Sequence, residues 1–581
     1  MANIKDLGKV YTSDILIIGG GIGGLCTGIR AKENNPKLNV LVVDRAVVGW
    51  AGQALKAGNG VLAREPHQDP QKMADYLVKV GGDYMNDQEF LLDYVTTIPD
   101  SIEFLDHCGV KLSRNADGSL RYFTMPNGLW SGCGIELDNV VSLRAHALKV
   151  GVRLLSHVQI FDLLTDDKGA VIGGVGFDSD DGNFHIFNAK AVVVATDGCY
   201  FKKVGGMFMG YGNGLAAAYR VGAMMRNAEL AFAGEPVYTA TNQPCYGAFN
   251  IIHNKDGVNI SDIYAPNAEE STPELQIGMW KEVQEGRGPL YADLRNPDSV
   301  REFIGGQGTE FLQRLFPDKL RWVMFEEQKA HEQGRVINSE TPEITIIMRM
   351  LGEFLWADRD FKTSVEGLWT AGKMSYQGSS YWGWVRGDGL GNAAQTALRV
   401  GDSIVKYVDG MDMPELNYDQ IVDLKEKLYA PLNRKSGRSP YEIFDRMEEM
   451  AHHVDIVLQK TEKSILGVLD MIEEMKKIVP ELIADDAHGL AKCREAADCL
   501  LCLEIMFRSA LMRKETRGTY WKHVRADYPE HDDKNWLKWI NVKQGEDGEM
   551  DIWTEDIPLW RYRIRPEGYE IPEGHVEEYY V

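Results

Sequence analysis

The feature that most constrains this chain is a glycine-rich turn close to its start. The apolar segment 14–18 leads directly into residues 19–24, Gly-Gly-Gly-Ile-Gly-Gly, and residues 25–33 then have a helical composition. Such glycines let the backbone turn tightly and approach a phosphate group that rests on the helix N-terminus. A second apolar segment, 40–43, ends at Asp44, twenty residues after the last glycine, where an acidic side chain reaches a ribose hydroxyl. The pattern predicts a dinucleotide-binding unit with cofactor contacts at Gly19, Gly21, Gly23, Gly24, Asp44 and Arg45.

Two later segments indicate which dinucleotide binds. The apolar segment 189–195 is followed by Thr-Asp-Gly, and the strand-like segment 366–372 reads Glu-Gly-Leu-Trp-Thr-Ala-Gly. In two-dinucleotide-type flavoproteins, a strand ending in A-T-x-G and a late G-L-[FW]-x-[AT]-G both return to the FAD site. A nicotinamide dehydrogenase would not need the late segment. We therefore expect FAD, with further contacts at Ala195, Thr196, Gly198, Gly372 and Lys373.

Composition excludes several other classes of protein. The 581 residues include 86 Asp or Glu and 63 Lys or Arg, a formal net charge of −23. This charge repels phosphate backbones, so we expect no nucleic-acid partner. No apolar segment reaches the roughly 18–20 residues that a membrane-spanning helix needs. The first residues lack the pattern of a secretory signal, so we expect a cytoplasmic protein that does not span a membrane.

The cysteines bear on electron transfer. Eight cysteines are scattered along the chain, and Cys499 and Cys502 form a C-x-x-C within a segment, 495–512, whose composition is that of a buried helix. Iron–sulfur clusters usually take four cysteines at short spacings, and the chain has no such set. We interpret Cys499 and Cys502 as core thiols. If the protein passes electrons through iron–sulfur clusters, these clusters lie in a partner subunit.

Five motifs spread over residues 12–545 relate the chain to one family of flavoproteins. They are the glycine turn, residues 49–59 (GWAGQALKAGN), residues 210–223 (GYGNG to GA), residues 286–294 (GRGPLYADL) and residues 513–538 (from RKETRG to DDKNWLK). With these motifs the chain resembles the flavoprotein subunits of the succinate dehydrogenase and fumarate reductase family. Within that family its closest likeness is to the adenylylsulfate reductase alpha subunit.

The resemblance implies an α/β fold, α+β overall: a two-dinucleotide-type FAD-binding domain with an inserted capping domain and a C-terminal helical domain. The implied boundaries are 1–235 and 345–410 for the two parts of the FAD-binding domain, 236–344 for the capping and substrate domain, 411–518 for the helical domain and 519–581 for a C-terminal extension. The sequence supports the helical domain independently, because apolar residues recur at helical spacing at Ile465, Val468, Leu469 and Ile472.

The resemblance also implies site residues. In fumarate reductases an arginine in an R-G segment of the capping domain supplies a proton, and Arg287 matches it; Arg386 matches a carboxylate-binding arginine. Two alternatives for Arg287 stay open, a structural ion pair and a contact with FAD, because arginine gives up its proton only with special positioning. Further FAD contacts are implied at Gln53, Asn59, Asn213, Gly389 and Asn392.

Several departures from the family pattern change the expected chemistry. The two histidines of fumarate reductases are missing after Glu229 and within 342–349, and the His-Arg pair of adenylylsulfate reductase is missing too. Six aromatic residues suggest a larger or more apolar substrate: Phe232, Tyr238, Tyr376, Tyr381, Trp382 and Trp384. The arm 47–61 has no histidine to attach FAD, so FAD should be noncovalent. Lys373 stands where an acidic residue is common, and its charge would raise the flavin potential.

From these observations we expect an FAD-dependent oxidoreductase, the catalytic flavoprotein subunit of a hetero-oligomer. It would pass two electrons between flavin and a small anionic or conjugated substrate, as a fumarate-reductase-like ene-reductase. A ferredoxin-like iron–sulfur subunit would supply the electrons, since the chain has no second glycine motif for NAD(P)H. The alternatives are adenylylsulfate-reductase-like sulfur chemistry and an electron-transfer or bifurcating subunit without an organic substrate. The tail 553–581 is either an arm over a partner or an arm packed on its own domain.

Overall fold

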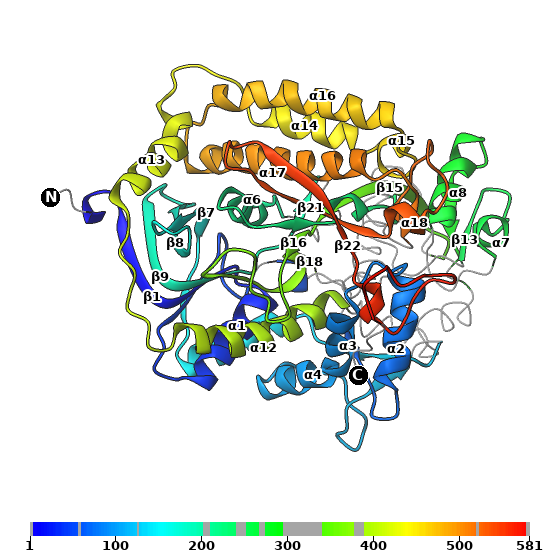
Figure 1. The fold of residues 1–581 in the computed structure, drawn as a ribbon, viewed down its shortest axis with the longest axis horizontal. Coiled ribbons are helices and arrows are strands. Elements are labelled where there is room, and N and C mark those ends of the chain that lie inside the picture. Colours follow the sequence, from blue (N-terminus) through cyan, green and yellow to red (C-terminus); the bar gives the residue numbers. More distant parts are fainter. Residues whose placement is uncertain are drawn as a thin grey trace.

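The structure is a computed structural model, and Figure 1 shows its layers of helices and sheets. It describes residues 4–50, 52–55, 60–124, 127–201, 210–239, 251–266, 273–293, 295, 340–376, 388–518 and 522–576. Among these residues, no helix is long and apolar enough to cross a membrane.

A seven-stranded sheet in the order β6-β2-β1-β9-β8-β7, with β17 beside β9, forms the centre of the molecule. Strands β6, β2, β1, β9 and β17 are parallel, and β7 and β8 are antiparallel to their neighbours. Strands β2 and β17 and the C-terminal ends of β1 and β9 are buried on both faces, which explains their apolar sequences. Their bounds are β1 (Lys9–Ile18), β2 (Val40–Val43), β6 (Arg153–Leu155), β7 (Val158–Thr165), β8 (Val171–Asp178), β9 (Phe184–Val194) and β17 (Leu368–Thr370).

Three helices pack together beside this sheet: α1 (Ile22–Asn34), α5 (Asn139–Val150) and α12 (Asp388–Val408). Their apolar side chains share one core with inward-facing residues of β1, β2 and β9. Figure 1 shows α1 and α12 side by side, although the sequence separates them by more than 350 residues. The segment 366–372, which the sequence predicts at the cofactor site, forms β17 beside β9, and the helix α12 that follows it packs on α1 of the first βαβ unit.

A smaller unit follows the second strand of that βαβ unit. It contains the sheet β3-β5-β4, with β3 (Gly60–Ala63), β4 (Tyr122–Thr124) and β5 (Ser131–Gly134), and helices α2 (Pro70–Tyr76), α3 (Gln88–Thr96) and α4 (Ile98–His107). Asp69 and Asp87 begin α2 and α3, because their carboxylates accept hydrogen bonds from backbone N–H groups of the first turn.

A second sheet carries the segment expected to cap the cofactor. Its strands are β10 (Cys199–Tyr200), β12 (Phe232–Tyr238), β13 (Ile252–His253), β14 (Leu290–Ala292) and β15 (Glu343–Gly352). Helices α7 (Ile260–Tyr264) and α8 (Pro273–Gln284) pack against it. Strand β15 pairs with β10, which lies just beyond the end of β9, and so joins the capping segment to the central sheet.

The helical unit consists of α13 (Tyr418–Tyr429), α14 (Tyr441–Met450), α15 (Val454–Val457), α16 (Glu462–Ile478) and α17 (Ala487–Met512). Of the apolar stripe on α16, Ile465, Val468 and Ile472 are buried and Leu469 is partly buried. Helix α17 packs against α16 and against α6 (Asn213–Arg220). In Figure 1 this unit lies on the side of the central sheet opposite α1 and α12.

The C-terminal segment completes a third sheet, in the order β18-β16-β11-β21-β22. After β19 (Arg517–Gly518), β20 (Lys522–His523) and α18 (Asp533–Trp536), the chain forms β21 (Lys538–Gln544) and β22 (Met550–Asp556). Strand β21 pairs with β22 on one side and with β11 (Met225–Arg226) on the other. The sheet continues from β11 to β16 (Leu355–Trp356) and β18 (Ser375–Tyr376). Ile557, Leu559 and Tyr562 are buried against Met85 and Trp539. The described part of the tail therefore packs on its own chain, the second of the two alternatives.

Candidate cofactor and substrate site

The glycine turn between β1 and α1 has the geometry of an anion-binding loop. Gly19 has φ +117°, and a Cβ atom there would lie 2.3 Å from the carbonyl oxygen of Ala195. A Cβ on Gly24 would lie 1.8 Å from the carbonyl oxygen of Gly19. A Cβ on Gly21, by contrast, would meet nothing within 4 Å, and no side chain caps α1 at this residue. The first N–H groups of α1 thus have open space in front of them, where a pyrophosphate can bind.

Asp44 lies beside this loop, as its spacing predicts. One carboxylate oxygen of Asp44 accepts a hydrogen bond from the N–H of Gly20 at 2.6 Å, and the other accepts one from Ala46 at 2.8 Å. The next residue, Arg45, instead bonds Glu495 of α17, with 2.9 Å between Nη1 and Oε1. Asp44 therefore lies beside the glycine turn, whereas Arg45 joins this edge of the sheet to the helical unit.

The later sequence segments return to the same edge of the sheet. Gly372 follows β17 with φ +76°, and its N–H donates to Oγ1 of Thr396 in α12 at 2.9 Å. A Cβ on Gly23 would lie 3.6 Å from the carbonyl carbon of Ala371, so this turn contacts the start of α1. Thr196, just after β9, contacts Met374 through Oγ1 at 2.7 Å from Sδ. The ends of β1, β2, β9 and β17 together form a cradle that fits FAD.

The other residues predicted to contact the cofactor differ in what surrounds them in the structure. The Asn213 amide donates to Asp498 at 2.7 Å and accepts from Gln159 at 3.0 Å, which ties it to a polar network. A Cβ on Gly198 would lie 2.5 Å from the carbonyl oxygen of Gly352, where the capping sheet meets the central sheet. Of the rest, Gly389 and Asn392 begin α12, and Gln53 lies in the 3-10 turn 53–55. Asn59 and Arg386 lie outside the described residues.

A buried polar cluster that sequence analysis missed lies at this edge. The Tyr200 hydroxyl lies 2.7 Å from Oδ1 of Asp197 and 2.7 Å from Oε1 of Glu353, and Glu353 Oε1 lies 3.9 Å from Nζ of Lys373. Burial raises the pKa of Glu353 to about 7, although the nearby charge of Lys373 opposes the shift. Because one hydroxyl carries one proton, both contacts of Tyr200 are hydrogen bonds only when one of the carboxyls is protonated. The only sequence signal is an acidic residue closing the apolar segment 344–352.

A buried ion pair lies on the neighbouring strands. Arg349 of β15 contacts Glu235 of β12 with 2.6 Å between Nη1 and Oε2, and their side chains are 5% and 2% exposed. Arg349 is also one of the charges that lower the pKa of Glu353, so the pair and the cluster belong to one electrostatic site. Both residues interrupt apolar strand sequences, a signal that could have found them.

Arg287 is held by carboxylates of the capping segment. Its guanidinium bonds Glu282 at 2.6 and 2.8 Å and Glu285 at 2.5 Å, and its side chain is 37% exposed. Hydrogen bonds to these carboxylates raise the pKa of Arg287 further above its usual value, while the bond from Arg287 lowers that of Glu282 to about 2. This geometry supports the structural ion pair, the alternative left open by the sequence, rather than proton donation.

The aromatic residues expected near a substrate are placed differently. Phe232 is fully buried, packs edge-on against Phe507 at 5.5 Å between ring centroids, and lies 4.0 Å from Nζ of Lys460. It is therefore a core residue, because β12 turns this side chain toward α17, and the expectation that it lines a pocket is wrong. Tyr238 is partly buried at the end of β12. The Tyr376 side chain and residues Tyr381, Trp382 and Trp384 lie outside the described part of the structure.

The cysteines near α6 are buried thiols. Cys199 and Cys499 have their sulfur atoms 3.6 Å apart, and Cys502 lies one helical turn further along α17. Burial raises the pKa of both Cys199 and Cys499, which keeps them protonated and unreactive. All seven cysteines in the described ranges are free and buried.

Two family models match the chain. The FAD binding domain model matches residues 14–237, and the fumarate reductase flavoprotein C-term model matches residues 446–569. The first of these ranges contains the glycine turn, Asp44 and the Thr196 segment, which together form much of the cradle. The second contains α16, α17 and the C-terminal strands, up to the segment that packs beside Met85.

Similar proteins cover nearly the whole chain. The 8-methylmenaquinol:fumarate reductase flavoprotein subunit of Wolinella succinogenes is 24% identical over 96% of this chain and 93% of its own length. The fumarate reductase flavoprotein subunit of Haemophilus influenzae is 25% identical over 92% of each chain.

Solved structures share the fold. A quinol fumarate reductase of E. coli has a TM-score of 0.80 at 20% identity, covering 96% of this chain and 98% of its own. The adenylylsulfate reductase of Archaeoglobus fulgidus has a TM-score of 0.75 at 19% identity, covering 96% and 97%. With two matching models, full-length relatives and a cradle that fits FAD, the chain belongs to the fumarate reductase and succinate dehydrogenase family of flavoproteins and is an FAD-dependent oxidoreductase.

Proposed function

We propose that this chain is the catalytic flavoprotein subunit of a reductase for a small anionic or conjugated substrate with an activated C=C bond. The observation that carries the proposal is the buried charged site beside the FAD cradle, formed by Glu353, Lys373, Tyr200, Arg349 and Glu235. FAD, when bound, supplies the electron pair as a hydride-type transfer at this edge of the sheet. Reduction of such a bond also needs positive charge and an acid, and this chain supplies both.

Lys373 would bind and polarise the substrate, and Arg349, although paired with Glu235, would add to the positive potential of the site. Lys373 and Arg349 lie near Glu353, close enough that their charges affect its pKa. In a buried site such charges favour a carboxylate or another electron-withdrawing anion more strongly than they do in water. Arg386 stays in the proposal as a further substrate-anion contact, on the basis of its motif.

Glu353 is the proposed general acid. A pKa of about 7 leaves much of its carboxyl protonated at neutral pH, and the Tyr200 hydroxyl at 2.7 Å holds that carboxyl in place. A general acid works best when its pKa is near the working pH. Arg287 is less suited to this role, because Glu282 and Glu285 hold its proton in ion pairs.

A ferredoxin-like iron–sulfur subunit is the proposed electron donor. The relatives from Wolinella succinogenes and Haemophilus influenzae are both named as flavoprotein subunits, so each works as part of a larger enzyme. The chain has eight scattered cysteines and no second glycine motif for NAD(P)H. Electrons that reach its flavin therefore come from another protein, and we propose a hetero-oligomer with noncovalent FAD.

The test is reoxidation of the reduced flavin. The flavin of the purified holoprotein is reduced without oxygen, and its absorbance is followed as fumarate, other 2-enoates and adenylylsulfate are added separately. We expect rapid reoxidation by a 2-enoate, and we expect Glu353→Gln to slow that step by about 100-fold or more, the usual contribution of a general acid. Glu343→Gln, at the exposed start of the same strand, is the matched control.

Three outcomes would contradict the proposal. Reoxidation by adenylylsulfate alone would assign sulfur chemistry instead. If no enoate reoxidises the flavin, but the flavin exchanges electrons normally with an iron–sulfur protein, the chain is an electron-transfer subunit without an organic substrate. An unchanged reoxidation rate in Glu353→Gln would remove Glu353 from the role of acid.

A further inference from the structure

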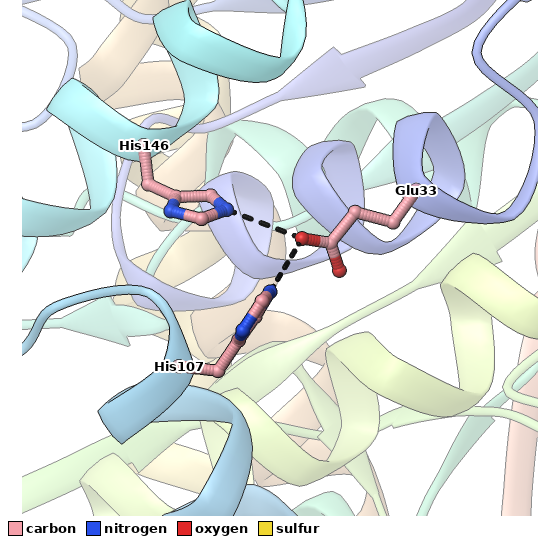
Figure 2. A group of neighbouring side chains, drawn as sticks. All are labelled: Glu33, His107 and His146. Carbon is pink, nitrogen blue, oxygen red and sulfur yellow. Dashed lines mark hydrogen bonds and ion pairs between the residues drawn. The ribbon is translucent and has the colours of Figure 1, made fainter.

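Two histidines and a glutamate converge on one point far from the cofactor cradle. Figure 2 shows the Glu33 carboxylate between the His107 and His146 rings, each of which points its Nε2 at the same oxygen. Nε2 lies 2.9 Å from Glu33 Oε1 in His107 and 3.1 Å in His146, and the ring centroids are 5.2 Å apart. The three side chains come from three helices, α1, α4 and α5. The possible ligand atoms of the three side chains all lie within 4.8 Å of one another. Among the described residues, no other group of three His, Cys, Asp or Glu side chains has this arrangement.

The backbone around this cluster favours a cation. Glu33 lies in the last turn of α1, and His107 is the last residue of α4. Helix C-termini carry partial negative charge, so a carboxylate at this end of α1 is unfavourable unless positive charge compensates it. The basic residues of the same turn of α1 are engaged elsewhere, since Arg30 pairs with Asp402 and Lys32 donates to backbone carbonyls of the following turn.

The distances suit a tetrahedral metal ion. Zinc binds imidazole nitrogen at about 2.0–2.1 Å and carboxylate oxygen at about 2.0–2.2 Å, which places two ligand atoms of a tetrahedron roughly 3.3 Å apart. The two N–O separations found here, 2.9 and 3.1 Å, are close to this value. The ligand atoms of the two histidines lie within 4.8 Å of each other, so shifts of the side chains would admit the ion. Without a metal, both rings must keep their proton on Nε2 to bond one oxygen; with a metal, both offer that nitrogen as a lone pair.

The cluster leaves a fourth position open to solvent. His146 is 12% exposed, Glu33 25% and His107 60%, so the cluster is closed on its inner side and open on its outer side.

We propose that Glu33, His107 and His146 bind one Zn²⁺ ion, or a similar divalent transition metal, with water in the open position. The ion joins the C-terminal ends of α1 and α4 to α5. Glu33 is separated from the N-terminus of α1, where the pyrophosphate of FAD is expected, by roughly 18 Å of helix at 1.5 Å per residue. The site is therefore remote from the expected FAD position, and the proposal does not rest on the reductase chemistry.

The experiment measures metal binding directly. The holoprotein is freed of metal with a chelator, titrated with Co²⁺ and then Zn²⁺, and analysed for metal content, visible ligand-field absorption and melting temperature. We expect one equivalent of Co²⁺ with a tetrahedral spectrum, displacement by Zn²⁺, and a rise in melting temperature, because a ligand that binds only the folded state stabilises it.

Variants locate the site. Glu33→Gln keeps the shape of the side chain, and His107→Ala changes the exposed ligand; each should weaken binding by at least about 100-fold, more than loss of an outer-shell contact does. His67→Ala is the matched control, because the exposed His67 lies 4.0 Å from Glu65 and, among the described residues, belongs to no group of three such side chains. Flavin content shows that each variant is folded. Absence of tight binding to the unmodified protein, or equal binding by all the variants, would overturn the proposal.

Discussion

At the scale of single residues, the properties of the proposed substrate site depend on which charged side chains are buried. Glu353, Arg349 and Glu235 lie on or beside strands whose other residues are apolar, and each is at most 5% exposed. A buried carboxyl that is partly protonated costs less free energy than a buried charge, and this is why the pKa of Glu353 is raised to about 7. Burial thus converts an ordinary acid into one that can exchange a proton at neutral pH.

The raised pKa of Glu353 predicts a pH dependence of stability. The carboxyl binds its proton more tightly in the folded state than in the unfolded state, where its pKa is near 4.5. Its stabilising contribution is therefore complete below about pH 4.5 and is lost as pH rises through about 7, a change of about 3 kcal/mol at most. Glu353→Gln should remove this decline, as measured by urea unfolding across that pH range. Glu343→Gln should retain it; equal pH dependence in all three proteins would show that Glu353 ionises normally.

At the scale of elements, one buried arginine joins three of them. Arg513, just after α17, bonds Glu229 in the 3-10 turn Ala228–Leu230, with 2.8 Å between Nε and Oε1. It also contacts Glu515 at 2.8 Å and donates to the carbonyl oxygens of Trp536 and Lys538 at 2.7 and 2.8 Å. The helical unit, the turn that precedes β12 and the start of β21 therefore meet at one guanidinium. The family motif RKETRG contributes to structure here.

Removal of this guanidinium should destabilise the protein strongly. Arg513→Ala leaves the carboxylates of Glu229 and Glu515 buried without one partner, a change that typically costs about 3–5 kcal/mol. Arg508→Ala is the control, because Arg508 pairs with Glu504 on the same helix but its side chain is 38% exposed, so the expected cost is below about 1 kcal/mol. Free energies of unfolding from urea titrations measure both. Similar losses in the two variants would show that burial of the network does not matter.

At the scale of the whole molecule, the C-terminal tail packs on helix α3 of the unit that follows β2. Gln88 of α3 exchanges hydrogen bonds with the backbone of Ile564 at 2.5 and 3.1 Å, and Arg561 contacts Glu89 at 2.7 Å. Figure 1 shows the C-terminal trace returning to α2 and α3. These contacts tie the described part of the tail to α3 of its own chain.

The cysteines of this chain lack the spacing of an iron–sulfur cluster, so we predict a partner subunit that carries the clusters. Protein purified natively without oxygen should carry a small cysteine-rich subunit in a fixed ratio, visible by mass spectrometry and by iron and sulfide content. The flavoprotein chain expressed alone should bind FAD but accept no electrons from NADH, because it has no second dinucleotide motif. A single chain that completes turnover with NADH would contradict this prediction.

Much of the fold follows from local sequence. The glycine turn, Asp44 and the segments ending at Gly198 and Gly372 predict the cradle, because each is a local pattern with one structural use. The role of Arg287 does not follow, since the same R-G motif can donate a proton or form an ion pair, and only the positions of Glu282 and Glu285 favour the second. The same is true of Phe232. The sequence predicts its strand, but it does not predict that the side chain points toward α17.

The sequence by itself determined the cofactor and the family, because the glycine spacing and the family motifs are local patterns of a few residues each. Only the tertiary structure decided which charged side chains share a site. Tyr200, Glu353 and Lys373 come from separate segments and meet where β10 and β15 join the edge of the central sheet. Glu33, His107 and His146 meet because three helices end or pass at one place. Their chemistry arises from burial and proximity, which no local pattern records.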